Sequence, residues 1–178
     1  MNQVALACGL SKATLYHYYR DKYALLVSIT ESHVVLLHAL VAQTIALGLP
    51  PEAHLRELIH RFVSAYAGAR HAHRVLTEDV KFLNDADRDR VLDTEREVVA
   101  GLAAALNAVR PDLNPARLSK PLTMLLFGMI NWMFTWMKPE AGLDHEAMAP
   151  IVADLFMGGL HAVQLPAATP QSTQQPLT

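Results

Sequence analysis

Between Ser11 and Lys22 the sequence gathers side chains that can contact an anion. Lys12, Arg20 and Lys22 face a single acid, Asp21, so the first 22 residues carry a net charge of +2; since the whole chain carries −2, the rest carries −4. A small positive segment on an acidic body is typical of a compact nucleic-acid contact. Three neighbouring side chains add hydrogen-bond donors for phosphate oxygens: Tyr16, His17 and Tyr18.

Two short helices can position these side chains. We expect one helix over residues 2–7, a turn at Gly9, and a second helix capped by Ser11 and reaching Tyr18. Two short helices joined by a glycine turn form a helix-turn-helix, whose second helix enters the DNA major groove. The alternative is a solvated basic turn between core helices. The predicted DNA contacts are Lys12, Ala13, Thr14, Tyr16, His17, Tyr18 and Lys22.

The stretch VALACGLSKATLYHYYRDKYALL, residues 4–26, resembles the DNA-binding signature of TetR-family transcriptional regulators. This resemblance implies a homodimeric regulator, a repressor, that binds double-stranded DNA at a palindromic operator and responds to a small apolar effector. The positions that carry the resemblance are Val4, Ala5, Gly9, Leu10, Ser11, Leu15, Tyr16, Tyr19, Lys22, Leu25 and Leu26.

The same resemblance implies a further helix ahead of these two, which completes a three-helix head. Met1 falls where that helix should already have ended, so we expect the first helix of the usual head to be missing from this sequence. An incomplete head should expose Leu6, Leu10 and Leu15. The alternative function is then a helical ligand-binding or dimerisation protein whose truncated head does not bind DNA.

The rest of the chain predicts an all-α protein. Apolar residues recur at three- and four-residue spacing, and strand-like alternation is nowhere sustained. We expect a partial helix-turn-helix head at 1–22, a helical-bundle ligand-binding and dimerisation domain at 23–164, and a disordered, charge-free tail at 165–178. The predicted helices of the body cover residues 22–47, 51–69, 74–83, 86–109, 114–138 and 144–163, with a break near 68–73 and a start signal at Asn114-Pro115.

The last two predicted helices are apolar on more than one face. Residues 121–137 hold no charge, and a helix that is apolar all round is normally buried all round. A membrane span is the alternative, but spans need about 20 apolar residues, and polar residues dilute this shorter stretch. We therefore predict a homodimer through these helices and no membrane contact. The interface candidates are Trp136, Ile151, Leu155, Phe156 and Leu160.

A set of aromatic, methionine and amide side chains can line a pocket for a small molecule. The alternative is that the same side chains are plain core. Residues 125–160 are similar to the end of a TetR subgroup that senses fatty acyl or aromatic acyl-CoA thioesters, so this second resemblance implies an effector of that class. The candidate ligand-binding residues are Phe62, Tyr66, Phe82, Met129, Asn131 and Trp132.

Few residues point to catalysis or to metal binding. The chain has no phosphate loop, no Gly-x-Ser-x-Gly and no His-Glu-x-x-His motif, and its nine histidines lack the companions of a metal site. We expect no enzyme activity, cofactor or metal; a small helical enzyme is the alternative. The single cysteine, Cys8, and the lack of a signal peptide at Met1–Ala7 predict a cytoplasmic protein.

Overall fold

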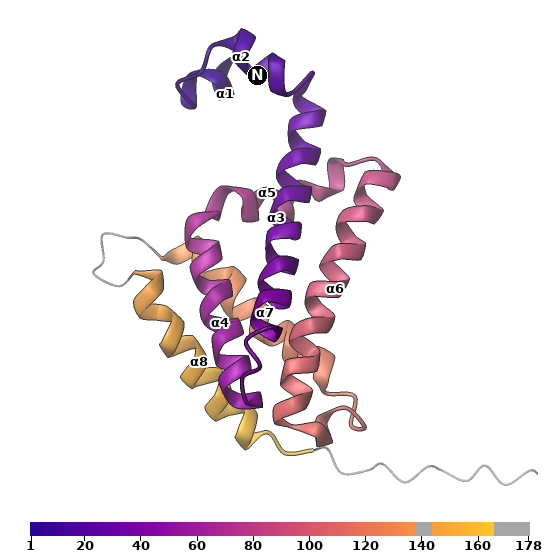
Figure 1. The fold of residues 1–178 in the computed structure, drawn as a ribbon, viewed down its shortest axis with the longest axis vertical. Coiled ribbons are helices and arrows are strands. Elements are labelled where there is room, and N and C mark those ends of the chain that lie inside the picture. Colours follow the sequence, from indigo (N-terminus) through magenta and orange to yellow (C-terminus); the bar gives the residue numbers. More distant parts are fainter. Residues whose placement is uncertain (138–143, 166–178) are drawn as a thin grey trace, which may run out of the picture.

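Figure 1 shows the computed structural model, which describes residues 1–137 and 144–165. Within these ranges every regular element is a helix, so the predicted all-α fold class is confirmed. The elements are α1 (Asn2–Ala7), α2 (Lys12–Tyr18), α3 (Lys22–Ile45), α4 (Pro51–Gly68), α5 (Arg70–Asp79), the 3₁₀-helix η1 (Val80–Phe82), α6 (Asp85–Val109), the 3₁₀-helix η2 (Pro111–Leu113), α7 (Ser119–Trp136) and α8 (His145–Ala162).

Helices α1 and α2 form a small head at the N-terminal end of α3, away from the body (Figure 1). Gly9 makes the turn between them with φ at 64°, a conformation that glycine adopts without steric cost. As predicted, Ser11 caps α2, and its hydroxyl accepts a hydrogen bond from the Thr14 backbone N–H at 3.0 Å. Leu6 is exposed, but Leu15 is only 4% exposed, so the expectation of an exposed Leu15 was wrong. Its side chain is buried where α1 and α2 contact each other.

Helix α3 joins the head to the body. It begins beside Asp21, whose carboxylate accepts a hydrogen bond from the Ala24 N–H at 2.7 Å. Its lower half packs between α4 and α6 and against α5 (Figure 1). By length and composition alone this helix could cross a membrane, but the core helix of a soluble protein and a signal sequence meet the same criteria. The buried Val34, Leu37 and Val41 place one face of α3 in the core of the body.

The core of the body forms around α4, with α8 lying alongside it (Figure 1). Leu55, Leu58, Ile59 and Phe62 recur at helical spacing on α4 and are fully buried. Clusters of buried side chains from α3, α6, α7 and α8 pack against them. The body is therefore one continuous helical core, which fixes the position of the lower half of α3.

The helix boundaries differ from the sequence-based expectations at two places. The break expected near 68–73 is the single residue Ala69, between α4 and α5. The helix start expected at Asn114-Pro115 was wrong, because Asn114 has helical dihedral angles (φ −69°, ψ −50°) and ends η2 instead of capping a new helix. A turn follows in which Arg117 has φ at 57°, and α7 begins at Ser119. The predicted disordered tail lies outside the described residues from 166 onward.

Candidate nucleic-acid interface and ligand cavity

The residues predicted to contact DNA lie on the outside of the head. Thr14 is half-buried, with its hydroxyl 2.7 Å from that of Ser11. Lys12 and Tyr16 are one turn apart on α2, and the Lys12 ammonium lies 5.8 Å from the centre of the Tyr16 ring. Cations and hydrogen-bond donors thus share one exposed surface. The remaining members of the predicted set are all exposed: Lys12, Ala13, Tyr16, His17, Tyr18 and Lys22.

A polar cluster ties the upper part of α3 to the start of α6. The Tyr23 hydroxyl donates to Asp87 at 2.5 Å and accepts from the Asn84 N–H at 3.0 Å. Arg90 pairs with Asp87 and donates to Glu31 at 2.9 Å. The hydrogen bond from Tyr23 holds the pKa of Asp87 below its usual value. Sequence reasoning missed this cluster and its role in fixing α3 against α6.

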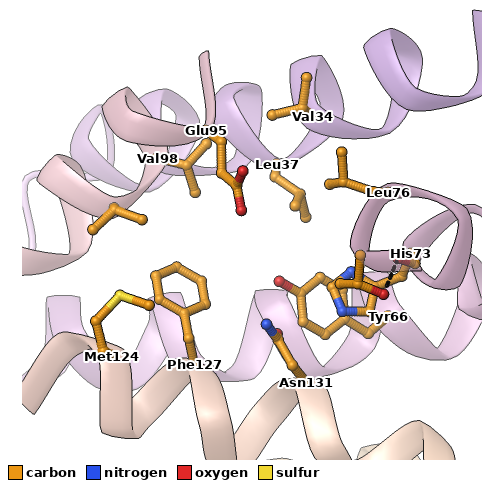
Figure 2. Close-up of a pocket in the computed structure, with 12 residues that line it drawn as sticks. Val34, Leu37, Tyr66, His73, Leu76, Glu95, Val98, Met124, Phe127 and Asn131 are labelled. Atoms are coloured by element: carbon orange, nitrogen blue, oxygen red, sulfur yellow. Dashed lines mark hydrogen bonds between the residues drawn. The ribbon is translucent and has the colours of Figure 1, made fainter. Parts of the chain in front are cut away.

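A cavity of about 60 Å³ lies inside the body (Figure 2). It has space for a few water molecules, each of which needs about 10–15 Å³. Val34 and Leu37 bring α3 into its wall, and Phe127 and Asn131 belong to α7. The complete set is Val34, Leu37, Tyr66, His73, Leu76, Thr77, Glu95, Val98, Val99, Met124, Phe127 and Asn131. The cavity therefore has mostly apolar walls and a few polar groups.

Two buried histidines support one end of this cavity. His33 Nε2 and His73 Nδ1 lie 3.2 Å apart, and the His73 ring stacks on Tyr66 with centroids 4.0 Å apart. Burial lowers the pKa of His33, and burial together with the neighbouring His33 lowers the pKa of His73 to about 4. Both imidazoles are therefore neutral at pH 7, and their hydrogen bond connects α3 to α5.

Glu95 supplies the negative charge of the cavity. Figure 2 shows its carboxylate pointing inward, with Tyr66 and Asn131 reaching toward the same space. Much of the residue is exposed, since it lies at the rim, yet partial burial raises the pKa of its carboxyl. Burial and the charge of Glu95 also raise the pKa of Tyr66. Within residues 1–137 and 144–165, the buried Asn131 Oδ1 has no hydrogen-bond partner.

Exposed apolar side chains gather on α7 and α8, two helices that contact each other. Leu125, Trp132 and Trp136 lie on one face of α7, since they are seven and four residues apart, and Ile151 and Leu155 lie one turn apart on α8. We call these five residues the α7–α8 apolar surface. No atom lies within 4 Å of the position a Cβ would take at Gly128, Gly158 or Gly159. The backbone is therefore open to close approach there.

Comparisons with known proteins identify the family. Residues 48–160 match the family model described as "Tetracyclin repressor-like, C-terminal domain", and residues 1–29 match "Bacterial regulatory proteins, tetR family". The chain belongs to the TetR family of transcriptional regulators. The second match covers α1, α2 and the start of α3, so the predicted helix-turn-helix is the DNA-binding element that this family uses.

Solved TetR structures share this fold. A TetR-family regulator from Bordetella parapertussis 12822 is 31% identical, with a TM-score of 0.81 over 92% of this chain and 85% of that one. PfmR from Thermus thermophilus is 21% identical, with a TM-score of 0.73 over 88% and 86%. AibR, solved in complex with isovaleryl coenzyme A and operator DNA, is 21% identical, with a TM-score of 0.70 over 86% and 84%. A search of curated proteins gave no match.

In this TetR body, only part of the predicted ligand set lines the cavity. Tyr66 and Asn131 do, while Phe62 is fully buried behind them, with its ring edge-to-face to Tyr66 and Phe127. Met129 is half-buried and packs against the core. Trp132 is 67% exposed and points away from the cavity. It follows Asn131 directly on α7, and neighbouring residues on a helix point in different directions.

Phe82 and two interface candidates also lie elsewhere than predicted. Phe82, 64% exposed, lines an open surface groove with Lys22 and Tyr23, because η1 turns it away from the core. Phe156 and Leu160 are 7% and 2% exposed, since they face the protomer core from α8. Of the predicted interface set, Trp136, Ile151 and Leu155 remain on the surface.

Sequence reasoning missed Glu95, although the sequence carries a signal for it. Val91, Val98 and Leu102 form the buried stripe of α6, and Glu95 falls between them at the same helical spacing. An acid in an apolar stripe either pairs with a cation or faces a polar ligand or water. His73 was also missed, because the predicted loop at 68–73 removed it from any helix face.

Proposed function

We propose that this TetR regulator is a homodimeric repressor that an apolar effector releases from a palindromic operator. One observation carries the proposal: α3 bears the head at its upper end and forms a wall of the cavity with Val34 and Leu37. TetR regulators typically act as ligand-responsive repressors, and they bind operator DNA, dimerise and bind small molecules. A regulator of transcription acts where the DNA is, so we propose a cytoplasmic location.

The size of the cavity supplies the mechanism. Small-molecule sites usually measure about 300–1,000 Å³, whereas this cavity measures about 60 Å³. A ligand must therefore enlarge it, and because protein cores are close-packed, the added volume displaces the helices around it. Moving α3 re-aims the head. Effector action needs only a difference in affinity between the two positions of α3.

The DNA complex needs two heads at a fixed distance. Recognition helices of a dimer read half-sites about 34–36 Å apart, or a multiple of that distance. We propose that the α7–α8 apolar surface joins the two protomers, leaving both heads free at the far end of α3. Lys12, Thr14, Tyr16, His17, Tyr18 and Lys22 would contact DNA, and Ala13 would allow close approach to the bases.

For the effector, the C-terminal resemblance and AibR's bound isovaleryl-CoA favour an acyl group. Leu37, Val98 and Phe127 offer an apolar wall for such a group. Among the described residues, none that lines the cavity is Lys or Arg. The phosphates of a coenzyme A would therefore stay outside, with the acyl end alone inside.

The proposal is tested by operator selection followed by release. The full chain is mixed with random duplex DNA, bound sequences are enriched, and fluorescence anisotropy then follows the complex as isovaleryl-CoA or a fatty acid is added. We expect a palindromic consensus and loss of the complex at saturating effector. A chain that dimerises and binds small molecules but enriches no sequence favours the alternative, a ligand-binding protein without DNA binding.

A further inference from the structure

We propose that the cavity selects an organic cation, a protonated amine on an apolar body, and that the carboxylate of Glu95 recognises it. This inference rests on the proposed function, because it takes the cavity to be the effector site. It replaces the acyl effector favoured above by a ligand of opposite charge to a fatty acid, a charge that neither the family match nor the fold of the relatives fixes.

The first argument is the unbalanced charge of Glu95. Within residues 1–137 and 144–165, its carboxylate makes no ion pair, and no cationic side chain lines the cavity. Its neighbour Arg96 forms its ion pair with Asp93. Partial burial raises the pKa of the Glu95 carboxyl, and the nearby charge of Arg96 offsets that effect only in part, so the charged form of Glu95 still lacks a direct partner. A ligand cation supplies the missing partner, and the low dielectric of the site strengthens the pair.

The second argument is the surroundings of that carboxylate. Figure 2 shows Tyr66 and Phe127 across the cavity from Glu95, with Asn131 between them. The Tyr66 ring stacks on His73, and its hydroxyl oxygen, which points into the cavity, can accept a hydrogen bond from an ammonium. Figure 2 shows the amide nitrogen of Asn131 toward the cavity, and its buried Oδ1 has no donor among the described residues. Rotation of the amide would turn Oδ1 to the cavity as an acceptor for an ammonium, which offers up to three donors. The carboxylate, the phenol oxygen and the amide oxygen are all complementary to a cation.

The same groups disfavour an anion. A free fatty acid that entered head-first would bring its carboxylate against Glu95, and like charges at short range repel strongly in a partly buried site. An acyl-CoA could enter only tail-first and would leave Glu95 without a partner. The two effector classes therefore differ in what they do for Glu95, and this difference can be measured.

Three molecules of nearly equal shape test the inference: cyclohexylmethylamine, cyclohexylmethanol and cyclohexanecarboxylate. They carry a positive, a neutral and a negative group on the same ring. Binding to the full chain is measured by calorimetry and by the shift in melting temperature. We expect the amine to bind at least about tenfold more tightly than the alcohol, which corresponds to one pKa unit of electrostatic preference, and the carboxylate to bind least.

Glu95→Gln is the decisive variant. It should weaken amine binding about tenfold or more while leaving alcohol binding nearly unchanged, because only the charge is removed. Glu97→Gln is the matched control, since Glu97 lies two residues along α6, is exposed and pairs with His38. It should leave all three affinities unchanged. Melting of each variant, followed by circular dichroism, establishes that it folds.

A second readout needs no variant. Amine binding by the natural chain should weaken as the pH falls toward the raised pKa of the Glu95 carboxyl, where Glu95 gains a proton and the amine keeps its own. Among the other titratable groups at the cavity, burial lowers the pKa of His33 and His73, which opposes their protonation, and Tyr66 keeps its proton.

The outcomes separate this inference from the proposed function. Amine binding no tighter than alcohol binding, or absent at millimolar concentration, overturns the inference, and so does an unchanged amine affinity in Glu95→Gln. If the amine fails in this way but fatty acids or acyl-CoA release the protein from the operator, the proposed function stands without the inference about the cation. If the amine binds through Glu95 but does not alter DNA binding, the inference stands and the proposed effector mechanism fails.

Discussion

Val41 of α3 and Gly101 of α6 are in such close contact that a Cβ on Gly101 would lie 2.5 Å from Val41 Cγ1. The two helices can approach this closely only because position 101 has no side chain. This contact fixes α3 against α6 on the side of the bundle where Leu37 and Val98 line the cavity. The spacing of α3 and α6 is therefore a property on which both the core and the proposed movement of the head depend.

Gly101→Ala should lower the free energy of unfolding by about 1–3 kcal/mol, the usual range for overpacking. The β-branched Val41 has little freedom to move away. Val41→Ala should restore part of the loss in the double variant, since it removes the clashing methyl groups. Chemical denaturation checks this, with Gly68→Ala as the control in open space. If the single Gly101→Ala variant is as stable as the natural chain, the added methyl group does not strain the contact between α3 and α6.

The buried histidine pair predicts a loss of stability in acid. The pKa of His73 is about 4 in the folded chain and 6.5 in the unfolded chain. Between these two pH values the unfolded state therefore binds a proton at His73 that the folded state does not bind. Stability should fall from pH 6.5 toward pH 4, by up to ~3 kcal/mol for this group. His73→Gln should flatten that slope in denaturation series at several pH values. An equal slope in the variant would assign the acid sensitivity to other groups.

Lys22→Ala tests the phosphate contact proposed at the start of α3. It should weaken binding to every DNA sequence and reduce the slope of log K against log salt by about 0.9, because one fewer counterion is released. Gel-shift titrations at several salt concentrations measure the slope. Lys120→Ala, which removes an equal charge from the exposed start of α7, should leave it unchanged. An unchanged slope for Lys22→Ala would remove this residue from the phosphate contacts.

The proposed dimer predicts different results for surface and buried positions. Trp132→Glu together with Leu155→Glu should give a folded monomer in sedimentation velocity, because both side chains are exposed on the α7–α8 apolar surface. Phe156→Glu should unfold the protomer instead, since Phe156 is buried. Val35→Glu, at an exposed apolar position on α3, is the control and should remain dimeric. A stable dimer of the double variant would place the interface elsewhere.

The sequence predicted best where a local pattern determines the structure. The turn at Gly9 and the cap at Ser11 depend on neighbouring residues only, and both were found. Asn114 misled the prediction because the same residue type that caps helices also ends short turns. Asn114 follows the 3₁₀-helix Pro111–Leu113 directly, so it ends that helix and does not cap a new one.

The cavity was harder to predict because its walls come from five helices that lie far apart in the sequence. Helical periodicity identified Tyr66 and Asn131 as candidates, but it could not tell which face of α7 meets the core, so Trp132 was placed beside Asn131. Glu95 was visible as an acid in the apolar stripe of α6. Its meaning depended on the cavity that it faces, in which no described lysine or arginine lines the wall, and only the fold supplies that fact.

The central claim is that a ligand in the body changes the spacing of the heads, and Cys8 allows this to be measured directly. Cys8 is the single cysteine of the chain and lies exposed in the head. Spin labels on Cys8 of both protomers report the distance between the heads by pulsed dipolar spectroscopy. We expect one distance distribution in the operator complex and a shifted one after saturation with cyclohexylmethylamine or isovaleryl-CoA, whichever raises the melting temperature. An unchanged distribution with bound ligand would contradict the account.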